Sequence, residues 1–438
     1  MLAELGTRAE QAVEQALEAG ADDVWAVATQ NRDVEFNYRD GALEKVQDAT
    51  SKNLSVQIYA RGRYSTHRTT DLHPDRLRDF LAQAVASTVA LEPDPHRRIT
   101  PADLFGDRPG TDLDLVDRTV AGLDRDQRTN WCIALDEAAR RHERVISATA
   151  GIYDGAEAYA AASSNGFSGA REATYCWLGT SVTLRDRGDR RASDGYYAGG
   201  THVGDLPDAA SIAETALDRA LVRLDAGKGP TGKTTMLVDS RAASSLVARL
   251  LQSAYAQSVQ QGRSYWSKLL GKKAFSEKLT LIDDPLIRRG LASRLFDDEG
   301  ISSRRLPIVE SGIVSNIYVD TYYGGKAGLP PTTGRQSNVR VGTGEKTLDE
   351  LVADVGEGIY VTSWLGGNAD GTTGDYSLGL RGHVIENGIV GRPIGEMNVT
   401  GNLRNLFRSL EAIGNDVYPY ATILSPSLVF GGVDFSGG

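Results

Sequence analysis

The sequence predicts an α+β protein of two domains. The N-terminal domain is expected to mix helices with antiparallel strands, and the C-terminal domain to be glycine-rich and mostly β. Three observations support this. The chain has 438 residues, more than one ordinary domain of about 100–200. Helical and strand periodicities in its first half do not follow a regular βαβ order. Of the 48 glycines, 23 lie in residues 324–438, a density that indicates many turns between strands.

The N-terminal domain is expected to span residues 1–226. Apolar side chains at helical spacing predict a first helix that Gly20 terminates. A charged stretch with four prolines, residues 92–112, predicts a loop or lid. Before that loop we expect strands at 24–29, 34–38 and 54–59 and a helix at 73–91. After it we expect a helix at 123–144, strands at 145–154, 157–164, 174–186 and 190–198, and a helix with an apolar stripe from Ile212 to Leu224.

The C-terminal domain is expected to span residues 227–438, after a glycine- and proline-rich junction at 225–230. A strand at 235–238 and a helix at 241–258 are predicted first. Short β segments separated by glycines are expected to follow to the C-terminus. Asn387-Gly388, between apolar residues, is a strong signal for a β-hairpin turn.

Charge and composition exclude several classes of partner. The formal net charge is −10, and the longest basic runs have two residues, so binding to nucleic acid is disfavoured. No apolar stretch reaches 18 residues, so we expect no membrane span. The first ten residues include acidic side chains where a signal peptide would be apolar. Cys132 and Cys176 are too few for a disulfide framework. We therefore predict a cytoplasmic protein.

One short motif is misleading. Residues 227–234, GKGPTGKT, match the phosphate-binding pattern G-x-x-x-x-G-K-[ST]. That loop requires a strand before it and a helix after it, whereas here the predicted order is reversed. Pro230 also removes one backbone amide that a phosphate would use. We interpret the segment as a linker and keep a nucleotide-binding switch as a remote alternative.

Local metal and nucleophile motifs are also missing. The six histidines include no pair at zinc-ligand spacing, and neither cysteine has a neighbouring ligand. The chain contains no G-x-S-x-G motif. Two acidic clusters, Asp283-Asp284-Pro285 and Asp297-Asp298-Glu299, could supply general acids or bases, but their neighbouring Pro285 and Gly300 favour turns.

The most informative segment is residues 366–382, GGNADGTTGDYSLGLRG. With the Asn387-Gly388 hairpin and ordered motifs elsewhere, it makes the chain resemble the TldD/PmbA family, once labelled modulators of DNA gyrase, and more closely its PmbA (TldE) branch. The resemblance covers nearly the whole chain. Its further motifs are VTGNL at 399–403 with IGND at 413–416, SPSLV at 425–429, GKK at 271–273, LIDDP at 281–285 and YYGGKAG at 322–328.

The resemblance implies an α+β subunit of a two-subunit cytosolic metalloprotease that degrades or trims unfolded peptides and leader peptides. In that family the TldD-like subunit carries an H-E-x-x-x-H zinc motif on a helix, and the TldE-like subunit does not. Relative to Gly262 and Gly271, the motif would fall at residues 247–252. Val247, Ala248 and Gln252 then replace the two metal ligands and the catalytic glutamate. We expect no cofactor in this chain and zinc in its partner.

The leading hypothesis is therefore a non-catalytic, substrate-guiding subunit, with no catalytic residue of its own and a TldD-like zinc-bearing homologue as partner. Self-association as a homodimer is possible when the partner is absent. An extended peptide would pair with a sheet edge. The candidate residues for the wall of the peptide channel are Gly366, Gly367, Asn368, Gly371, Thr372, Thr373, Gly374, Asp375 and Tyr376. The main alternative is an autonomous hydrolase that uses carboxylates such as Asp370 and Asp375.

Overall fold

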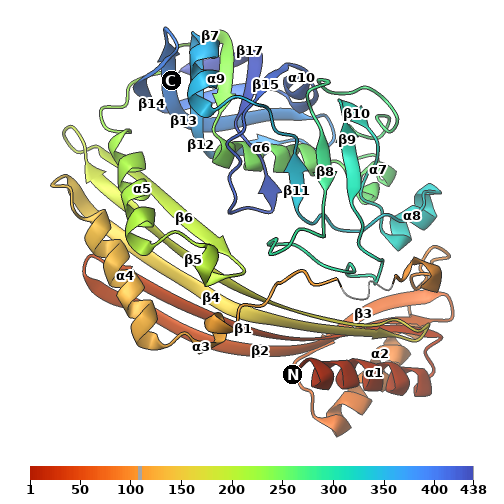
Figure 1. Cartoon of the computed structure of the whole chain (residues 1–438). Helices are drawn as coiled ribbons and strands as arrows, with labels where there is room; N and C mark the ends of the chain where they lie inside the picture. The colour runs from red at the N-terminus through yellow and green to blue at the C-terminus, as the bar shows by residue number, and fades with distance from the viewer. Residues whose placement is uncertain (107–110, 438) are drawn as a thin grey trace.

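The computed structural model describes residues 1–106 and 111–437. Its N-terminal half is built on one antiparallel sheet of six strands, in the order β3-β2-β1-β4-β5-β6. The long strands of this sheet run beneath the C-terminal half (Figure 1). They are β1 (Asp23–Arg39), β2 (Ala42–Ala60), β3 (Arg63–Thr69), β4 (Val145–Ser163), β5 (Ser168–Arg185) and β6 (Arg191–Gly200).

All four long strands of this sheet exceed their predicted bounds: β2 begins at Ala42 instead of residue 54 and β5 at Ser168 instead of residue 174, and β3 was not predicted. The separate strands expected at 24–29 and 34–38 form one strand, β1, and those at 145–154 and 157–164 form β4, so these predictions are wrong. The polar residues of β1 that suggested a turn pair on both sides; Asn31 lies opposite Ser51 and Glu157. Gly155 marks a close approach, because a Cβ there would lie 2.0 Å from the carbonyl oxygen of Arg32. Pairing with both neighbours therefore overrides the local turn signals.

Two groups of helices cover one face of this sheet. α1 (Leu2–Glu18) and α2 (Pro74–Val89) pack against β1, β2 and β4 near one end of the long strands. α4 (Arg125–Ala139) and α5 (Ala209–Leu221) pack against β1, β4, β5 and β6 near the other end (Figure 1). Even-numbered residues of β4 contact both groups, which places the helices on the same face. Ala150 and Ala160 are examples. The short α3 (Arg118–Gly122) lies before α4. The helices predicted in this half are confirmed: α2 and α4 are shorter than predicted, and α5 begins and ends three residues earlier than the predicted helix.

The opposite face of the sheet carries an aromatic cluster that contacts the C-terminal half. The rings of Trp25 and Phe167 stack with centroids 4.9 Å apart. Phe296, from the C-terminal half, meets Phe167 at 5.1 Å in an edge-to-face arrangement. Tyr159, Trp25 and Phe167 are buried there. This cluster holds the two halves together through apolar burial.

The core of the C-terminal half is a small closed barrel. Its strands follow the order β14-β13-β12-β7-β17, and pairing between β14 and β17 closes the ring. They are β7 (Gly232–Val238), β12 (Gly358–Ala369), β13 (Asp375–Glu386), β14 (Ile389–Asn402) and β17 (Leu428–Gly437). A further strand, β15 (Leu410–Ile413), pairs antiparallel with β17. The expectation of only short strands is therefore wrong for this barrel. The hairpin turn is confirmed, with φ of 53° at Asn387 and 71° at Gly388.

A second sheet of short strands lies beside the barrel, in the order β10-β9-β8-β11-β16. Its strands are β8 (Leu281–Asp283), β9 (Leu306–Glu310), β10 (Ile313–Val314), β11 (Val339–Val341) and β16 (Ile423–Leu424). The helices of this half are α6 (Ser240–Leu251), α7 (Ala256–Gln260), α8 (Thr321–Ala327), α9 (Leu348–Val355) and α10 (Leu403–Arg408). Barrel, short sheet and α6 share one apolar core. The predicted α+β fold class is confirmed.

Some predictions concern the connections. In the predicted loop at 92–112 the structure has one short 3₁₀ turn, η1 (Ala102–Leu104), and residues 107–110 lie outside the described residues. Another 3₁₀ turn, η2 (Val203–Asp205), precedes α5. The domain boundary between residues 226 and 227 stays a prediction. No helix within residues 1–106 and 111–437 is long and apolar enough to cross a membrane.

Candidate functional site

The helix expected to carry the degenerate metal motif is α6. The Asp239 side chain caps it by accepting a hydrogen bond from the backbone N–H of Arg241 at 3.0 Å. Its apolar face packs into the molecule, since Leu246, Val247, Leu250 and Leu251 are all buried in the C-terminal core. The prediction that the helix continues to residue 258 is wrong. The chain leaves α6 at Leu251, and Tyr255 forms an isolated β-bridge with Tyr318 before the separate α7 begins.

The three degenerate positions on α6 lie in different environments. Val247 is fully buried in the core, Ala248 is half-buried, and Gln252 is exposed at the C-terminal cap. Alkyl side chains at 247 and 248 have no donor atom for a metal. The residues present therefore do not fit a zinc ion. Within the described part of the chain, no group of three or more His, Cys, Asp or Glu side chains could hold a metal ion.

An open cavity of about 430 Å³ lies between α6 and the middle of β12. We call it the α6–β12 groove. Ser245 and Arg249 line it from the helix, and Trp364 and Gly366 from the strand. The indole Nε1 of Trp364 donates to the carbonyl oxygen of Ala242 at 2.9 Å and thereby holds strand and helix together. The full lining is Arg241, Ala242, Ser245, Arg249, Thr362, Ser363, Trp364, Leu365 and Gly366.

The charged groups of this groove are arginines. Arg249 Nη1 donates to the carbonyl oxygen of Ser245 at 3.0 Å and to its Oγ at 3.2 Å. Burial lowers the pKa of the Arg249 guanidinium. Arg241 Nη1 donates to the carbonyl oxygen of Gly195, at 2.9 Å. The lining contains no His, Cys, Asp or Glu, so it offers no general base. Its guanidinium donors suit carbonyl or carboxylate oxygens, such as those of a peptide.

The predicted channel residues form the β12–β13 hairpin. Gly366, Gly367 and Asn368 are exposed near the end of β12, after an irregularity in its pairing with β13. Gly367 has φ of 102°, and a Cβ there would lie 2.1 Å from the carbonyl oxygen of Ser377. Glycine is therefore required at this position by the backbone itself. Gly366 reaches the α6–β12 groove, whereas Gly374 and Tyr376 are buried, Tyr376 in the barrel core.

The turn of this hairpin is joined to the segment that follows α6. Ser253 Oγ donates to the carbonyl oxygen of Gly371 at 2.9 Å, and the backbone N–H of Tyr265 donates to the same oxygen at 3.1 Å. Thr372 and Thr373 are exposed at its tip. The structure thus brings the glycine-rich segment and the degenerate metal motif together, although more than 100 residues separate them in the sequence.

Asp370 and Asp375, the carboxylates of the alternative hypothesis, accept hydrogen bonds that stabilise this turn. Asp370 Oδ1 accepts hydrogen bonds from the backbone N–H groups of Thr372, at 2.6 Å, and Thr373, at 3.3 Å. Asp375 accepts from Asn402 Nδ2 at 2.9 Å. This bond, with another from Thr373, holds the pKa of the Asp375 carboxyl below its usual value. Neither observation favours an autonomous carboxylate hydrolase, which would need a proton-transferring group poised near neutral pH.

The predicted order around residues 227–234, a helix before and a strand after, is confirmed, but residues 232–234 already belong to strand β7 and are not part of a linker. α5 precedes them and strand β7 begins at Gly232, so no helix N-terminus points into the loop. The backbone N–H of Gly227 donates to the carbonyl oxygen of Pro393 at 3.0 Å, and the carbonyl oxygen of Gly227 accepts from Gly395 at 3.0 Å. Strand pairing occupies the groups that a phosphate loop would present.

Each acidic cluster lies at a turn, although Asp283 itself ends strand β8. The sequence did not reveal that Asp283, Asp284 and Asp297 are buried, whereas Asp298 is exposed. Asp297 Oδ1 accepts from the backbone N–H groups of Glu299 and Ile301, both at 3.0 Å. Glu299 Oε2 accepts from the backbone N–H of Thr321 at 2.9 Å. Burial, together with the neighbouring carboxylate of Asp297, raises the pKa of Glu299 to about 7. In the other cluster, buried Asp283 accepts from the Tyr318 hydroxyl at 2.9 Å.

Sequence analysis also missed an arginine cluster beside the groove. Asp194 of β6 forms ion pairs with Arg223 at 2.5 Å, Arg219 at 3.5 Å and Arg241 at 3.5 Å. Arg219 comes from α5, Arg223 from the turn just after it, and Arg241 from α6. The pairs therefore link the two halves of the molecule. No local pattern in the sequence indicates this cluster, because its residues come from separate elements.

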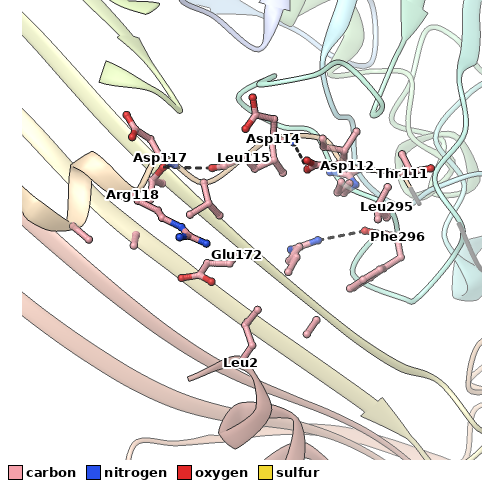
Figure 2. Close-up of a pocket in the computed structure, with 18 residues that line it drawn as sticks. Leu2, Thr111, Asp112, Asp114, Leu115, Asp117, Arg118, Glu172, Leu295 and Phe296 are labelled. Carbon is pink, nitrogen blue, oxygen red and sulfur yellow. Dashed lines mark hydrogen bonds between the residues drawn. The ribbon is translucent and has the colours of Figure 1, made fainter. Parts of the chain in front are cut away.

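A separate cavity of about 710 Å³ lies along β5 of the N-terminal sheet (Figure 2). Leu2 of α1, Arg118 of α3 and Glu172 of β5 point into it, and Leu295 and Phe296 border it from the C-terminal half. None of the predicted channel residues lines it.

The closed barrel, the long N-terminal sheet and the position of α6 define a protein of the PmbA/TldD-like fold. Two models of this family match the chain: the PmbA/TldA metallopeptidase central domain over residues 118–224 and the C-terminal domain over residues 231–437. The chain belongs to the PmbA/TldD metallopeptidase family.

Three proteins resemble this chain over nearly their whole length. The metalloprotease PmbA of Escherichia coli O157:H7 is 27% identical, over 98% of this chain and 96% of that protein. A crystal structure described as a putative modulator of DNA gyrase, from Bacteroides thetaiotaomicron, is 35% identical with a TM-score of 0.95, over 99% of this chain and 98% of that one. TldE from Thermococcus kodakarensis has the same fold, with a TM-score of 0.87 at 16% identity and coverage of 98% and 100%.

Proposed function

We propose that this chain is the non-catalytic, substrate-guiding subunit of a heteromeric zinc metalloprotease of the TldD/TldE type, which degrades or trims unfolded peptides. The observation that carries the proposal is on α6. The helix that would present a metal motif instead turns Val247 into the core and places Ala248 beside it. A family member whose motif positions bear no ligand needs a second subunit to supply the metal.

The role of the chain in the complex is to position the peptide. The α6–β12 groove offers the guanidinium groups of Arg241 and Arg249, the Trp364 ring and the exposed backbone near Gly366. Arginine donors bind peptide carbonyl and carboxylate oxygens, and backbone pairing tolerates many sequences. These features support the binding of an extended chain with little side-chain selectivity. The partner would be a TldD-like homologue with an H-E-x-x-x-H motif.

Co-expression tests the proposal. The chain and an H-E-x-x-x-H homologue from the same genome are purified together and assayed on an unstructured peptide. We expect a stable complex whose peptidase activity a chelator abolishes and zinc restores, and no activity from this chain alone. The Arg249→Ala variant in the complex should raise KM. Arg76→Ala, at an exposed site on α2, is the matched control. Failure of the two chains to associate, or equal activity without the homologue, would contradict the proposal.

A further inference from the structure

One edge of the N-terminal sheet is only partly covered. β5 pairs with β4 over residues 168–184, but its other neighbour, β6, pairs with it only over residues 176–185. Residues 168–175 of β5 therefore form an edge. A single backbone bond covers this edge near its end: the N–H of Thr174 donates to the carbonyl oxygen of Leu115 at 2.9 Å. The chain segment of Leu115 then turns away, since the carbonyl oxygen of Leu113 accepts from Arg289.

The backbone groups of Ala170 and Glu172 point toward the uncovered side. In an antiparallel ladder, residues two apart direct their N–H and C=O groups to the same side. Thr174 directs its N–H away from β4, and the pairing with β4 has no irregularity between residues 168 and 174. Ala170 and Glu172 therefore present two N–H and two C=O groups away from β4. No described residue forms a backbone hydrogen bond with them on that side.

Ala170 and Glu172 both line the cavity of about 710 Å³, and Figure 2 shows the Glu172 side chain there. The side chains of Ala156 and Ala170 in its lining are small, and the helices on this face pack in two separate apolar clusters. Leu2 borders one side of the cavity, and Arg118, on α3, borders another. The uncovered stretch from Ser168 to Glu172 is about 13 Å long at about 3.3 Å per residue, which accommodates four or five residues of an extended chain.

The charges around the cavity favour a peptide over an anionic ligand. Asp114 is held by Arg289 at 2.6 Å and Arg288 at 2.9 Å, and Asp117 accepts from the backbone N–H of Val203 at 2.9 Å. Glu172 and Arg118 have no ion pair among the described residues and point into the same part of the cavity (Figure 2). Four carboxylates and three guanidinium groups line the cavity in all, so it has no net attraction for phosphate or nucleic acid.

We propose that the β5 edge at Ala170–Glu172 binds an extended peptide by strand addition. The bound segment makes up to four backbone hydrogen bonds with these two residues. Its side chains alternate between the hollow beside Leu2 and the surface beside Phe296. The peptide class rests on the proposed function, whereas the site itself is separate from the α6–β12 groove. The N-terminal sheet would hold one part of a substrate chain while another part lies in that groove.

Binding of a fluorescent, capped, unstructured peptide to the purified full-length chain tests this site. Glu172→Pro removes the N–H that faces the cavity but no bond to β4, so the ladder is retained. Glu172→Ala removes the same side chain and keeps the N–H. We expect the proline variant to bind at least fivefold more weakly than the alanine variant, which corresponds to about 1 kcal/mol for one hydrogen bond. Fluorescence anisotropy gives the two affinities.

Hydrogen exchange measured by mass spectrometry supplies a readout on the unmodified chain. Added peptide should slow exchange in segment 168–173. Protection confined to residues 365–368, equal affinities for the two variants, or no binding at all would overturn the inference. These results are independent of the assay for the proposed function. An inactive complex with protection of 168–173 removes only the proposed role, and an active complex without it removes only this site.

Discussion

The hydroxyl of Ser253 donates a hydrogen bond of 2.9 Å to the carbonyl oxygen of Gly371. This bond connects Ser253, two residues after the end of α6, with the turn of the β12–β13 hairpin. The helix that carries the degenerate metal motif and the glycine-rich segment thus form one unit. The following experiments examine this unit and the framework that supports it.

Removal of the Ser253 hydroxyl should loosen the hairpin turn. We expect Ser253→Ala to lower the free energy of unfolding by about 1 kcal/mol, because one buried hydrogen bond is lost. Exchange of the amides in residues 370–374 should become faster. Urea unfolding and hydrogen exchange measure the two effects. Ser87→Ala, at an exposed position on α2, is the control and should change stability by less than about 0.5 kcal/mol. An unchanged exchange rate in the turn would contradict this account.

Restoring the metal motif residues should not restore a metal site. In the triple variant Val247→His, Ala248→Glu, Gln252→His, the first imidazole would lie in the apolar core where Val247 is fully buried. Burial of an unpaired polar group costs about 1–3 kcal/mol. We expect lower stability in urea and no stoichiometric zinc by elemental analysis. The double variant without the change at Val247 should retain more stability. Stoichiometric zinc with wild-type stability in the triple variant would show that α6 is placed differently.

The buried ion pair between Arg128 and Asp154 should be essential for the N-terminal half. Asp154 accepts two hydrogen bonds of 2.6 Å from the Arg128 guanidinium, and the side chains are only 4% and 1% exposed. Asp154→Ala leaves the guanidinium buried without its partner, and we expect a loss of about 3–5 kcal/mol. Glu277→Ala breaks the exposed pair with Lys273 and should cost less than about 1 kcal/mol. Similar urea midpoints for both variants would refute the expectation.

Glu299 should make stability fall as pH rises. Its pKa is about 7 in the folded chain, above the usual 4.5, because burial and the carboxylates of Asp297 and Asp320 disfavour its charge. Between about pH 4.5 and 7 the folded state therefore holds a proton that the unfolded state has released. The stabilising effect of this proton is present at low pH and is lost as pH rises through about 7.

Glu299→Gln mimics the protonated carboxyl at every pH. We expect the variant to match the wild type near pH 4, below the pKa of the unfolded carboxyl, and to be more stable at pH 8, as measured by urea midpoints at the two pH values. A difference between the two proteins that is the same at both pH values would contradict the assignment.

The sequence predicted the presence and the start of α6, although not its end at Leu251, because periodicity over a dozen residues is a local property. It predicted the Asn387-Gly388 turn for the same reason, since left-handed backbone angles favour these residue types. It failed where pairing decided the outcome. Gln30–Asp33 and Gly155 suggest turns by composition, yet both lie inside long strands. Their backbone groups bond to neighbouring strands, and this gain exceeds their weak local preference.

In the candidate site, too, some features follow from the local sequence and others only from tertiary contacts. The sequence by itself determined the fold class and showed that residues 227–234 only resemble a phosphate loop. It also determined the lack of metal ligands at Val247, Ala248 and Gln252, because residue identity decides which atoms can bind a metal. Only the tertiary structure decided that β14 meets β17 to close the barrel and that Gly371 lies against Ser253. It also decided that the edge of β5 at Glu172 opens on a cavity. These arrangements join segments far apart in the chain, and their formation depends on burial and backbone pairing that no local pattern encodes.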